Sequence, residues 1–93
     1  MVQVTRRIRV EGRVQGVGCR VFIEREAIRL GIKGFVRNRR DGSVEVLAHG
    51  ETSSVDALVA HIRRGPRGGR IDFVHIEHDD TTTGDDFVVA PTV

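Results

Sequence analysis

The sequence lacks the features that mark several common protein classes. It has a single cysteine, Cys19, so an intramolecular disulfide is excluded and the free thiol fits a reducing compartment. No apolar run reaches the roughly 20 residues that a membrane-spanning helix needs. The first residues, MVQVTRR, also lack the apolar core of a signal peptide. We therefore expect a cytoplasmic protein that does not insert into a membrane.

The length and composition are those of one small globular domain. A chain of 93 residues is long enough to bury one modest core but not two. Apolar residues make up 39% of the chain and charged residues 30%, which is ordinary for a globular protein. We find no internal repeat, linker or low-complexity segment and expect a single domain over residues 1–93.

Charge is distributed unevenly along the chain, although the net charge is only +2. Residues 1–40 hold ten arginines and one lysine against three glutamates, which gives +8. Residues 41–93 hold four arginines against ten acidic residues, which gives −6. Two interpretations are open: an arginine-rich solvated surface, or a basic half that steers anionic substrates inward and binds them with forked guanidinium groups.

The first half of the chain predicts a strand followed by a helix. Apolar and polar residues alternate over residues 5–11, which is typical of a half-buried strand. A glycine-rich segment follows, and residues 20–30 then have the periodicity of an amphipathic helix. The apolar face of this helix consists of Cys19, Ile23, Ala27 and Leu30.

The second half predicts a hairpin, a second helix and further strands. Strands at 32–38 and 43–49 flank a turn that contains the sequence Asp-Gly, a strong hairpin signal. A helix capped by Thr52 or Ser53 runs to Arg64, with Asp56 in its first turn. The apolar stripe of this helix consists of Val55, Leu58, Val59 and Ile62. After it we expect a strand at 71–78, an acidic connection at 79–86 and a short strand at 87–89.

This order of elements predicts an α+β fold. Strand, helix, strand, strand, helix, strand is the ferredoxin-like arrangement, in which two helices cover one face of an antiparallel sheet. RNA-recognition domains share this order and stack bases on aromatic side chains of their central strands. Here the third strand reads VEVLAH, and the chain has four Phe and no Tyr or Trp. We therefore expect no nucleic-acid partner.

The glycine-rich segment between the first strand and the first helix is the principal candidate site. Residues 12–20 read GRVQGVGCR, and glycine lets backbone N–H groups approach a ligand closely. A helix N-terminus adds unpaired N–H groups and a positive partial charge, and the guanidinium of Arg20 can bind two phosphate oxygens. The segment therefore predicts an oxyanion site formed by Gln15, Gly16, Val17, Gly18, Cys19 and Arg20.

These motifs give the chain a strong resemblance to acylphosphatases. The first family motif is matched by residues 12–17 (GRVQGV) together with Arg20. The second is matched by residues 34–38 (GFVRN), followed by glycine and valine at the spacings of the family. The order of the elements and the Gly-Pro sequence after the second helix also agree, so the resemblance covers essentially the whole chain.

The resemblance implies a hydrolase that cleaves the carboxyl–phosphate bond of acyl phosphates. In this family the loop from Arg13 to Arg20 would wrap the phosphoryl group, Arg20 would clamp it, and Asn38 would hold the attacking water. The implied enzyme is a monomer that binds a small acyl phosphate, or a phosphate or sulfate ion in its place, and that needs no cofactor or metal.

Each of these residues also has a simpler interpretation from the sequence alone. Arg20 could be a helix-surface arginine paired with Glu24. Asn38, beside a tight turn, could hydrogen-bond to its own backbone. Gln15 fits a role in bracing the loop better than one in touching the substrate.

Cys19 is the main departure from the family, which usually has Phe at this position. Its place on the apolar face of the helix favours a small buried hydrophobe, and the lost ring would leave a cavity unless a neighbour such as Phe22 fills it. The alternative is a reactive thiol, because a helix N-terminus beside Arg20 lowers the pKa of a cysteine. If the substitution spoils the site, the chain would be a binding module without full activity.

The sequence favours neither a metal site nor a role in handling carbamoyl phosphate. The four histidines do not predict a metal site, because His75 and His78 point to opposite faces of a strand and the acidic residues at 79–86 lack the spacing of a calcium loop. An acylphosphatase-like domain also begins the larger hydrogenase-maturation carbamoyltransferases, which handle carbamoyl phosphate. The zinc-finger cysteines of those proteins are absent from this sequence, which favours the simple hydrolase.

Overall fold

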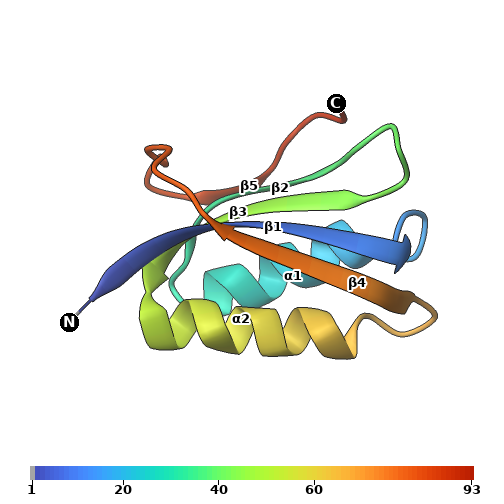
Figure 1. The fold of residues 1–93 in the computed structure, drawn as a ribbon, viewed down its shortest axis with the longest axis horizontal. Helices are drawn as coiled ribbons and strands as arrows, with labels where there is room; N and C mark the ends of the chain where they lie inside the picture. Colours follow the sequence, from blue (N-terminus) through green and yellow to red (C-terminus); the bar gives the residue numbers. More distant parts are fainter. Residues whose placement is uncertain (1) are drawn as a thin grey trace.

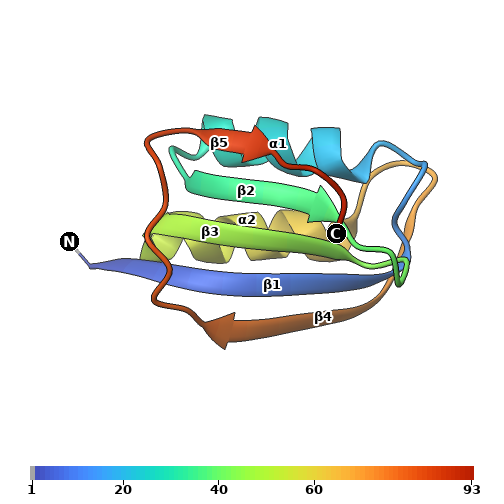
Figure 2. The same ribbon diagram turned by 90° about the horizontal axis from the view of Figure 1, so that it is seen from above.

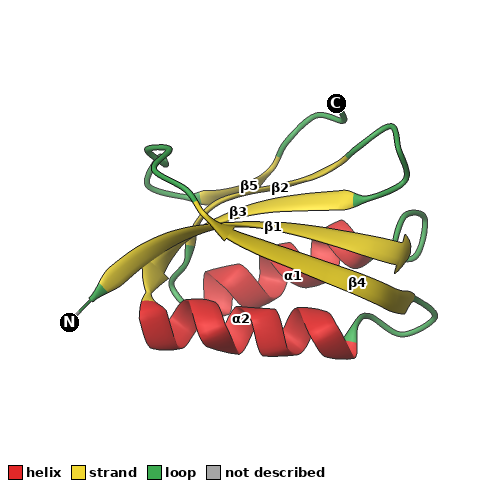
Figure 3. Ribbon diagram, in the orientation of Figure 1, coloured by secondary structure: helices red, strands yellow, loops and turns green. Residues whose placement is uncertain are grey.

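The computed structural model describes residues 2–93 and consists of a sheet with two helices on one face (Figure 1). Figure 3 shows the same two layers, with both helices on one side of the strands. The elements, in chain order, are β1 (Gln3–Arg13), α1 (Cys19–Arg29), β2 (Lys33–Asn38), β3 (Val44–Glu51), α2 (Thr52–Arg64), β4 (Arg70–His78) and β5 (Phe87–Val89). The ferredoxin-like order expected from the sequence is confirmed.

The strands lie in the order β4-β1-β3-β2-β5. The pairs β1–β3, β1–β4 and β2–β3 are antiparallel, as expected, but β5 pairs with β2 in parallel. The parallel pair has a topological cause. Residues 79–86 cross from the β4 edge to the β2 edge at one end of the sheet, so β5 must run opposite to β4, in the direction of β2 (Figure 2).

The core lies between the sheet and the helices and is built from the apolar faces that the periodicity predicts. Cys19, Ile23 and Ala27 of α1 are all buried, whereas Leu30 is only partly buried and packs on the edge of the core. From α2 the core receives Val55, Leu58 and Ile62. The sheet contributes, among others, Ile8, Val10, Val36, Val44, Val46 and Ala48.

Helix α2 begins without the side-chain cap that the sequence suggested. The residue before the helix is Glu51, in an extended conformation, and no side chain caps the first turn. Thr52 fails as a cap because its backbone N–H and its hydroxyl both donate to the carbonyl of Val2, at 3.0 and 3.3 Å. Asp56 lies beyond the first turn, where it does not face the free N–H groups.

Three connections meet at the end of the sheet where β2 ends. They are residues 14–18 between β1 and α1, residues 39–43 between β2 and β3, and residues 65–69 between α2 and β4 (Figure 2). The glycine-rich segment and Asn38 of the second motif are thus brought to the same end. Within residues 2–93, neither helix has the length and apolarity required to span a membrane.

Gly34 of β2 lies where β2 and β3 approach each other too closely for a side chain. Its φ is 134°, and a Cβ there would stand 1.8 Å from the carbonyl oxygen of Leu47 on β3. Replacing Gly34 with alanine should therefore cost about 2–4 kcal/mol of unfolding free energy, measured by urea denaturation. Gly84→Ala is the matched control, because no atom lies within 4 Å of a Cβ built there. Equal stability of the two variants would contradict the packing described here.

Candidate active site

Two glycines shape the loop between β1 and α1. Gly16 and Gly18 have φ angles of 73° and 77°, in the left-handed region that residues with a Cβ rarely adopt. Val14 is 1% exposed and anchors the start of the loop in the core. The loop therefore turns sharply into α1, with Gly18 as the residue that precedes the first helical turn.

The backbone N–H groups of this loop form a set of free donors. Phe22 donates to the carbonyl of Gly18 at 2.9 Å and is the first residue of the helix to do so. The N–H groups of residues 15–20 make no backbone hydrogen bond within residues 2–93, and no side chain caps the helix. Free N–H groups and the positive end of a helix dipole together favour an anion at this position.

The side chain of Gln15 ties the loop to the β2–β3 turn. Its Nε2 donates to the carbonyl of Arg39 at 2.7 Å and to the carbonyl of Ser43 at 2.8 Å. Both donors of the amide group are thus used within the protein. The interpretation that Gln15 braces the loop matches this geometry, because its side-chain nitrogen has no donor left for a ligand.

The turn that receives these bonds is itself held at both ends. Asp41 accepts the backbone N–H and the hydroxyl of Ser43, at 2.9 and 2.6 Å, and these bonds lower the pKa of its carboxyl group. Arg39 donates its backbone N–H to the carbonyl of Ser43 at 2.8 Å. On the face of the sheet away from the helices, the guanidinium of Arg39 lies 3.2 Å from the carboxylate of Glu45.

Glu45 organises the arginines of that outer face. It is 5% exposed and also binds Arg37 at 2.6 Å and Arg7 at 3.1 Å. Burial disfavours its charged form, but the hydrogen bonds and charges of Arg37 and Arg7 outweigh burial and lower its pKa. Part of the basic N-terminal half is therefore neutralised by an acid from the second half, and those arginines are not free to bind a ligand.

Arg20, in contrast, is free. It lies in the first turn of α1 and is half-buried. The pairing with Glu24 that its sequence position allows is not formed, and Arg20 has neither an ion pair nor a side-chain hydrogen bond with any of the residues the structure describes. Its guanidinium is available to an anion held by the adjacent N–H groups.

The side chain of Asn38 is also without a partner. It is the last residue of β2, and its Oδ1 is buried but accepts no hydrogen bond within residues 2–93. A turn asparagine would bond to its own backbone, and this one does not. Leaving a buried polar atom unpaired costs roughly 1–3 kcal/mol, so such atoms need an explanation, and a bound water or a functional role is one.

Cys19 is a core residue and not a reactive thiol. Its side chain is 3% exposed, and burial raises its pKa to about 11. This agrees with the interpretation of Cys19 as a small buried hydrophobe and not with the alternative of a reactive thiol, because the desolvation of the thiol raises its pKa. Only the backbone N–H of Cys19 can serve an anion, and Phe22 is one of the partly buried residues that pack against the same core.

The histidines lie apart from this site and use other partners. His75 pairs with Glu11 and His78 with Asp80, each at 2.7 Å. Over the described range 2–93, no three His, Cys, Asp or Glu side chains are grouped as metal ligands would be.

Comparison with known proteins gives a consistent result. The sequence profile of the acylphosphatase family matches residues 6–89. A curated acylphosphatase of Nitrobacter hamburgensis is 55% identical over 74 residues, which is 80% of this chain and 75% of that protein. Across the first eight curated relatives, the aligned part spans 66–93% of the relative's length.

Solved structures agree with the sequence comparison. The crystal structure of acylphosphatase from Bacillus subtilis has a TM-score of 0.89 at 32% identity and covers 96% of this chain and 99% of its own. Full-length HypF in a phosphate- and nucleotide-bound form has a TM-score of 0.90 at 26% identity, but this chain corresponds to only 12% of it. The second likeness is to one part of a much larger protein.

The burial of Cys19 predicts slow reaction with thiol reagents. A pKa of about 11 in place of 9.0 lowers the thiolate fraction at pH 8 by about 100-fold, and burial slows access further. We expect labelling of the native protein by a chromogenic disulfide at pH 8 to be at least about 100-fold slower than labelling of the urea-unfolded chain. Comparable rates in the two states would show that the thiol is accessible and ionised.

Proposed function

Because this chain belongs to the acylphosphatase family, we propose that Arg20 grips the phosphoryl group of its substrate and that Asn38 holds the attacking water. The activity is hydrolysis of the carboxyl–phosphate bond of acyl phosphates, which releases a carboxylate and inorganic phosphate. The observation that carries the residue assignment is that Arg20 and Asn38, in the two motifs at one end of the sheet, both have side chains without partners among residues 2–93.

The phosphoryl oxygens would be held by two kinds of donor. The free N–H groups of residues 15–20 surround them at the positive end of α1, and Arg20 supplies a forked pair of charged donors. These donors are already in place before the substrate arrives. They therefore stabilise the charge that accumulates on the equatorial oxygens in the transition state without a cost of reorganisation.

Asn38 would place the water in line with the bond that breaks. Its amide group can accept from the water or donate to it, and Asn38 ends β2 directly before Arg39, whose carbonyl accepts a hydrogen bond from Gln15 of the loop. The water oxygen forms a bond to phosphorus while the bond from phosphorus to the carboxyl oxygen breaks. The carboxylate leaves with its electron pair and needs no general acid, and a phosphate oxygen accepts the proton of the water.

We also propose that the protein acts in the cytoplasm as a monomer. The chain has a single cysteine, so it forms no intramolecular disulfide, as suits a reducing compartment. The exposed large apolar side chains are distributed over several elements, among them Val2 before β1, Ile28 on α1 and Phe73 on β4. Size-exclusion chromatography with light scattering measures the molar mass in solution, which should be the 10.3 kDa of one chain.

The residue roles are tested by hydrolysis of benzoyl phosphate in the presence of EDTA. Removing one preorganised group of this kind typically lowers the rate by on the order of 10²–10³, so Arg20→Ala and Asn38→Ala should each lose that much of kcat/KM. The loss in Asn38→Ala should fall on kcat, because water is misplaced while the phosphoryl group still binds. Arg20→Ala should also raise KM and the inhibition constant of inorganic phosphate.

Arg29→Ala is the matched control for these variants. Arg29 is an exposed arginine of α1 that pairs with Glu26, and a surface pair of this kind contributes little to stability. Full activity of Arg29→Ala beside the two losses would support the assignment. Unchanged activity in folded Arg20→Ala or Asn38→Ala would overturn the role of that residue, and a folded wild type that binds phosphate without hydrolysis would indicate a binding module.

A further inference from the structure

A groove runs along the side of α1, next to the phosphate-binding loop. It has a volume of about 530 Å³ and lies between the first turns of α1 and the connection from α2 to β4. Its walls come from Val17, Gly18, Val21, Phe22 and Pro66, with Arg25 and Arg67 beside them. No role in the mechanism above uses this groove.

The groove is continuous with the site of chemistry. Val17 and Gly18 belong to the loop whose free N–H groups would hold the phosphoryl oxygens, and the same two residues line the groove. Val21 follows directly after Arg20 in the chain. A molecule whose phosphoryl group occupies the loop therefore has this groove within reach of its other end.

Apolar surface gathers in the groove. Val21 is 61% exposed although it lies on a helix that packs on the sheet. A single exposed valine needs no explanation, but here Val17 and Phe22 line the groove beside it, and Pro66 lines it from the connection between α2 and β4. A pocket with apolar walls and a few placed polar groups is the usual form of a small-molecule site.

Positive charge borders the groove. Arg25 and Arg67 are both exposed, and neither forms an ion pair with any residue in the described part of the chain. They come from opposite walls, one from α1 and one from the connection between α2 and β4. Two unpaired guanidinium groups from the two sides of the groove complement an anionic substituent on a molecule bound there.

We propose that this groove, the acyl groove, binds the acyl part of the substrate and sets its specificity. The preferred acyl phosphate has an apolar acyl group, which lies along Val21, Phe22 and Pro66, and an anionic substituent at its far end, which Arg25 and Arg67 bind. This inference rests on the proposed function, because it places the phosphoryl end of the same molecule in the loop of residues 15–20.

The apolar part is tested by a ratio of two substrates. Benzoyl phosphate carries an apolar ring, whereas the acyl group of acetyl phosphate is too short to reach along the groove, so the ratio of their kcat/KM values reports the acyl groove. Val21→Ser removes apolar contact area and should lower this ratio about three- to tenfold. Ile28→Ser is the control, since Ile28 lies on the same helix, is 60% exposed and does not line the groove.

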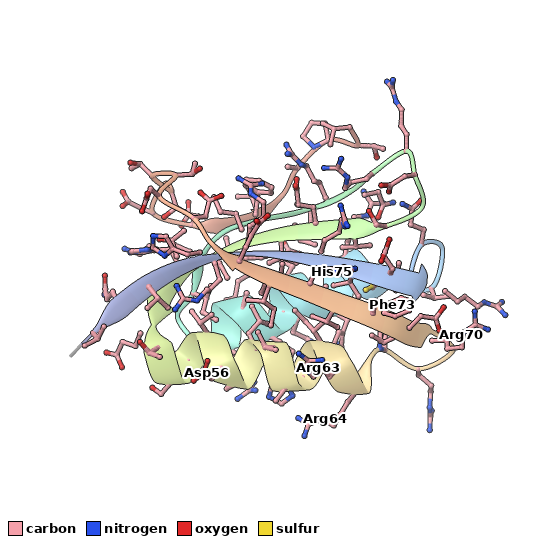
Figure 4. All side chains as sticks on the ribbon, in the orientation of Figure 1. Asp56, Arg63, Arg64, Arg70, Phe73 and His75 are labelled. Atoms are coloured by element: carbon pink, nitrogen blue, oxygen red, sulfur yellow. The ribbon has the colours of Figure 1, made fainter. Side chains whose placement is uncertain are left out.

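The charged part is tested with 4-carboxybenzoyl phosphate. The wild type should prefer it to benzoyl phosphate, and Arg67→Gln should lower this preference about three- to tenfold, with the loss reduced at high salt. Arg63→Gln is the control: Arg63 is an exposed arginine of α2, labelled in Figure 4, and is not part of the groove. Urea denaturation of all four variants identifies any loss that comes from unfolding.

The outcomes separate this inference from the proposed function. If acetyl phosphate and benzoyl phosphate are hydrolysed but Val21→Ser lowers both kcat/KM values equally, or neither, the acyl groove is wrong and the proposed function stands. If the apolar ratio falls but the preference for the carboxylated substrate is absent, the anionic part is wrong. If no acyl phosphate is hydrolysed by the folded protein, the proposed function itself fails.

Discussion

The two hydrogen bonds of the Gln15 amide join the two halves of the site. One half is the loop of residues 15–20, whose own backbone N–H groups are free for a ligand and so contribute nothing to holding the loop in place. The other half is the hairpin that carries Asn38. Because Gln15 donates to two carbonyls of the turn, at Arg39 and Ser43, the position of the loop relative to the end of β2 is set by these contacts. Water placement depends on that relative position, because a small displacement of a reacting group is costly in rate.

The two faces of the sheet differ in how their arginines are paired. On the face without helices, Glu45 forms ion pairs with Arg7 of β1, Arg37 of β2 and Arg39 of the turn. Arg7 also pairs with Asp79 at 2.8 Å. Hydrogen bonds from Thr81 and Arg7 lower the pKa of the Asp79 carboxyl group. Arg20 is on the helical side and has no such partner. Four of the eleven basic residues in the first forty, Arg7, Arg29, Arg37 and Arg39, are therefore used in ion pairs, and Arg20 is among those left for a ligand.

The sequence was sufficient to predict the fold because each local signal pointed the same way. The alternation in β1, the helical stripe from Cys19 to Ala27 and the Asp-Gly turn are local features, and the structure confirms each of them. The direction of β5 and the failure of Thr52 as a cap were missed. Both are set by contacts between distant segments, β5 by the path of residues 79–86 and Thr52 by the carbonyl of Val2.

In the candidate site, too, the local features could be predicted from the sequence and the long-range contacts could not. Its two motifs were visible in the sequence, and the burial of Cys19 followed from its place on the apolar face of α1. The partners of Gln15 and the groove beside Val21 were not visible, since both depend on segments more than twenty residues apart that meet only in the folded chain. Tertiary contacts of this kind leave no periodic pattern from which they could be predicted.

The most direct test of the central claim is the fate of the solvent oxygen during hydrolysis of benzoyl phosphate in water enriched in oxygen-18. Mass spectrometry of the two products shows where the water attacked. A water held in line with phosphorus at Asn38 places the label in inorganic phosphate and leaves benzoate unlabelled. Label in benzoate would mean attack at the carbonyl carbon, and would contradict a site built to hold the phosphoryl group and its attacking water.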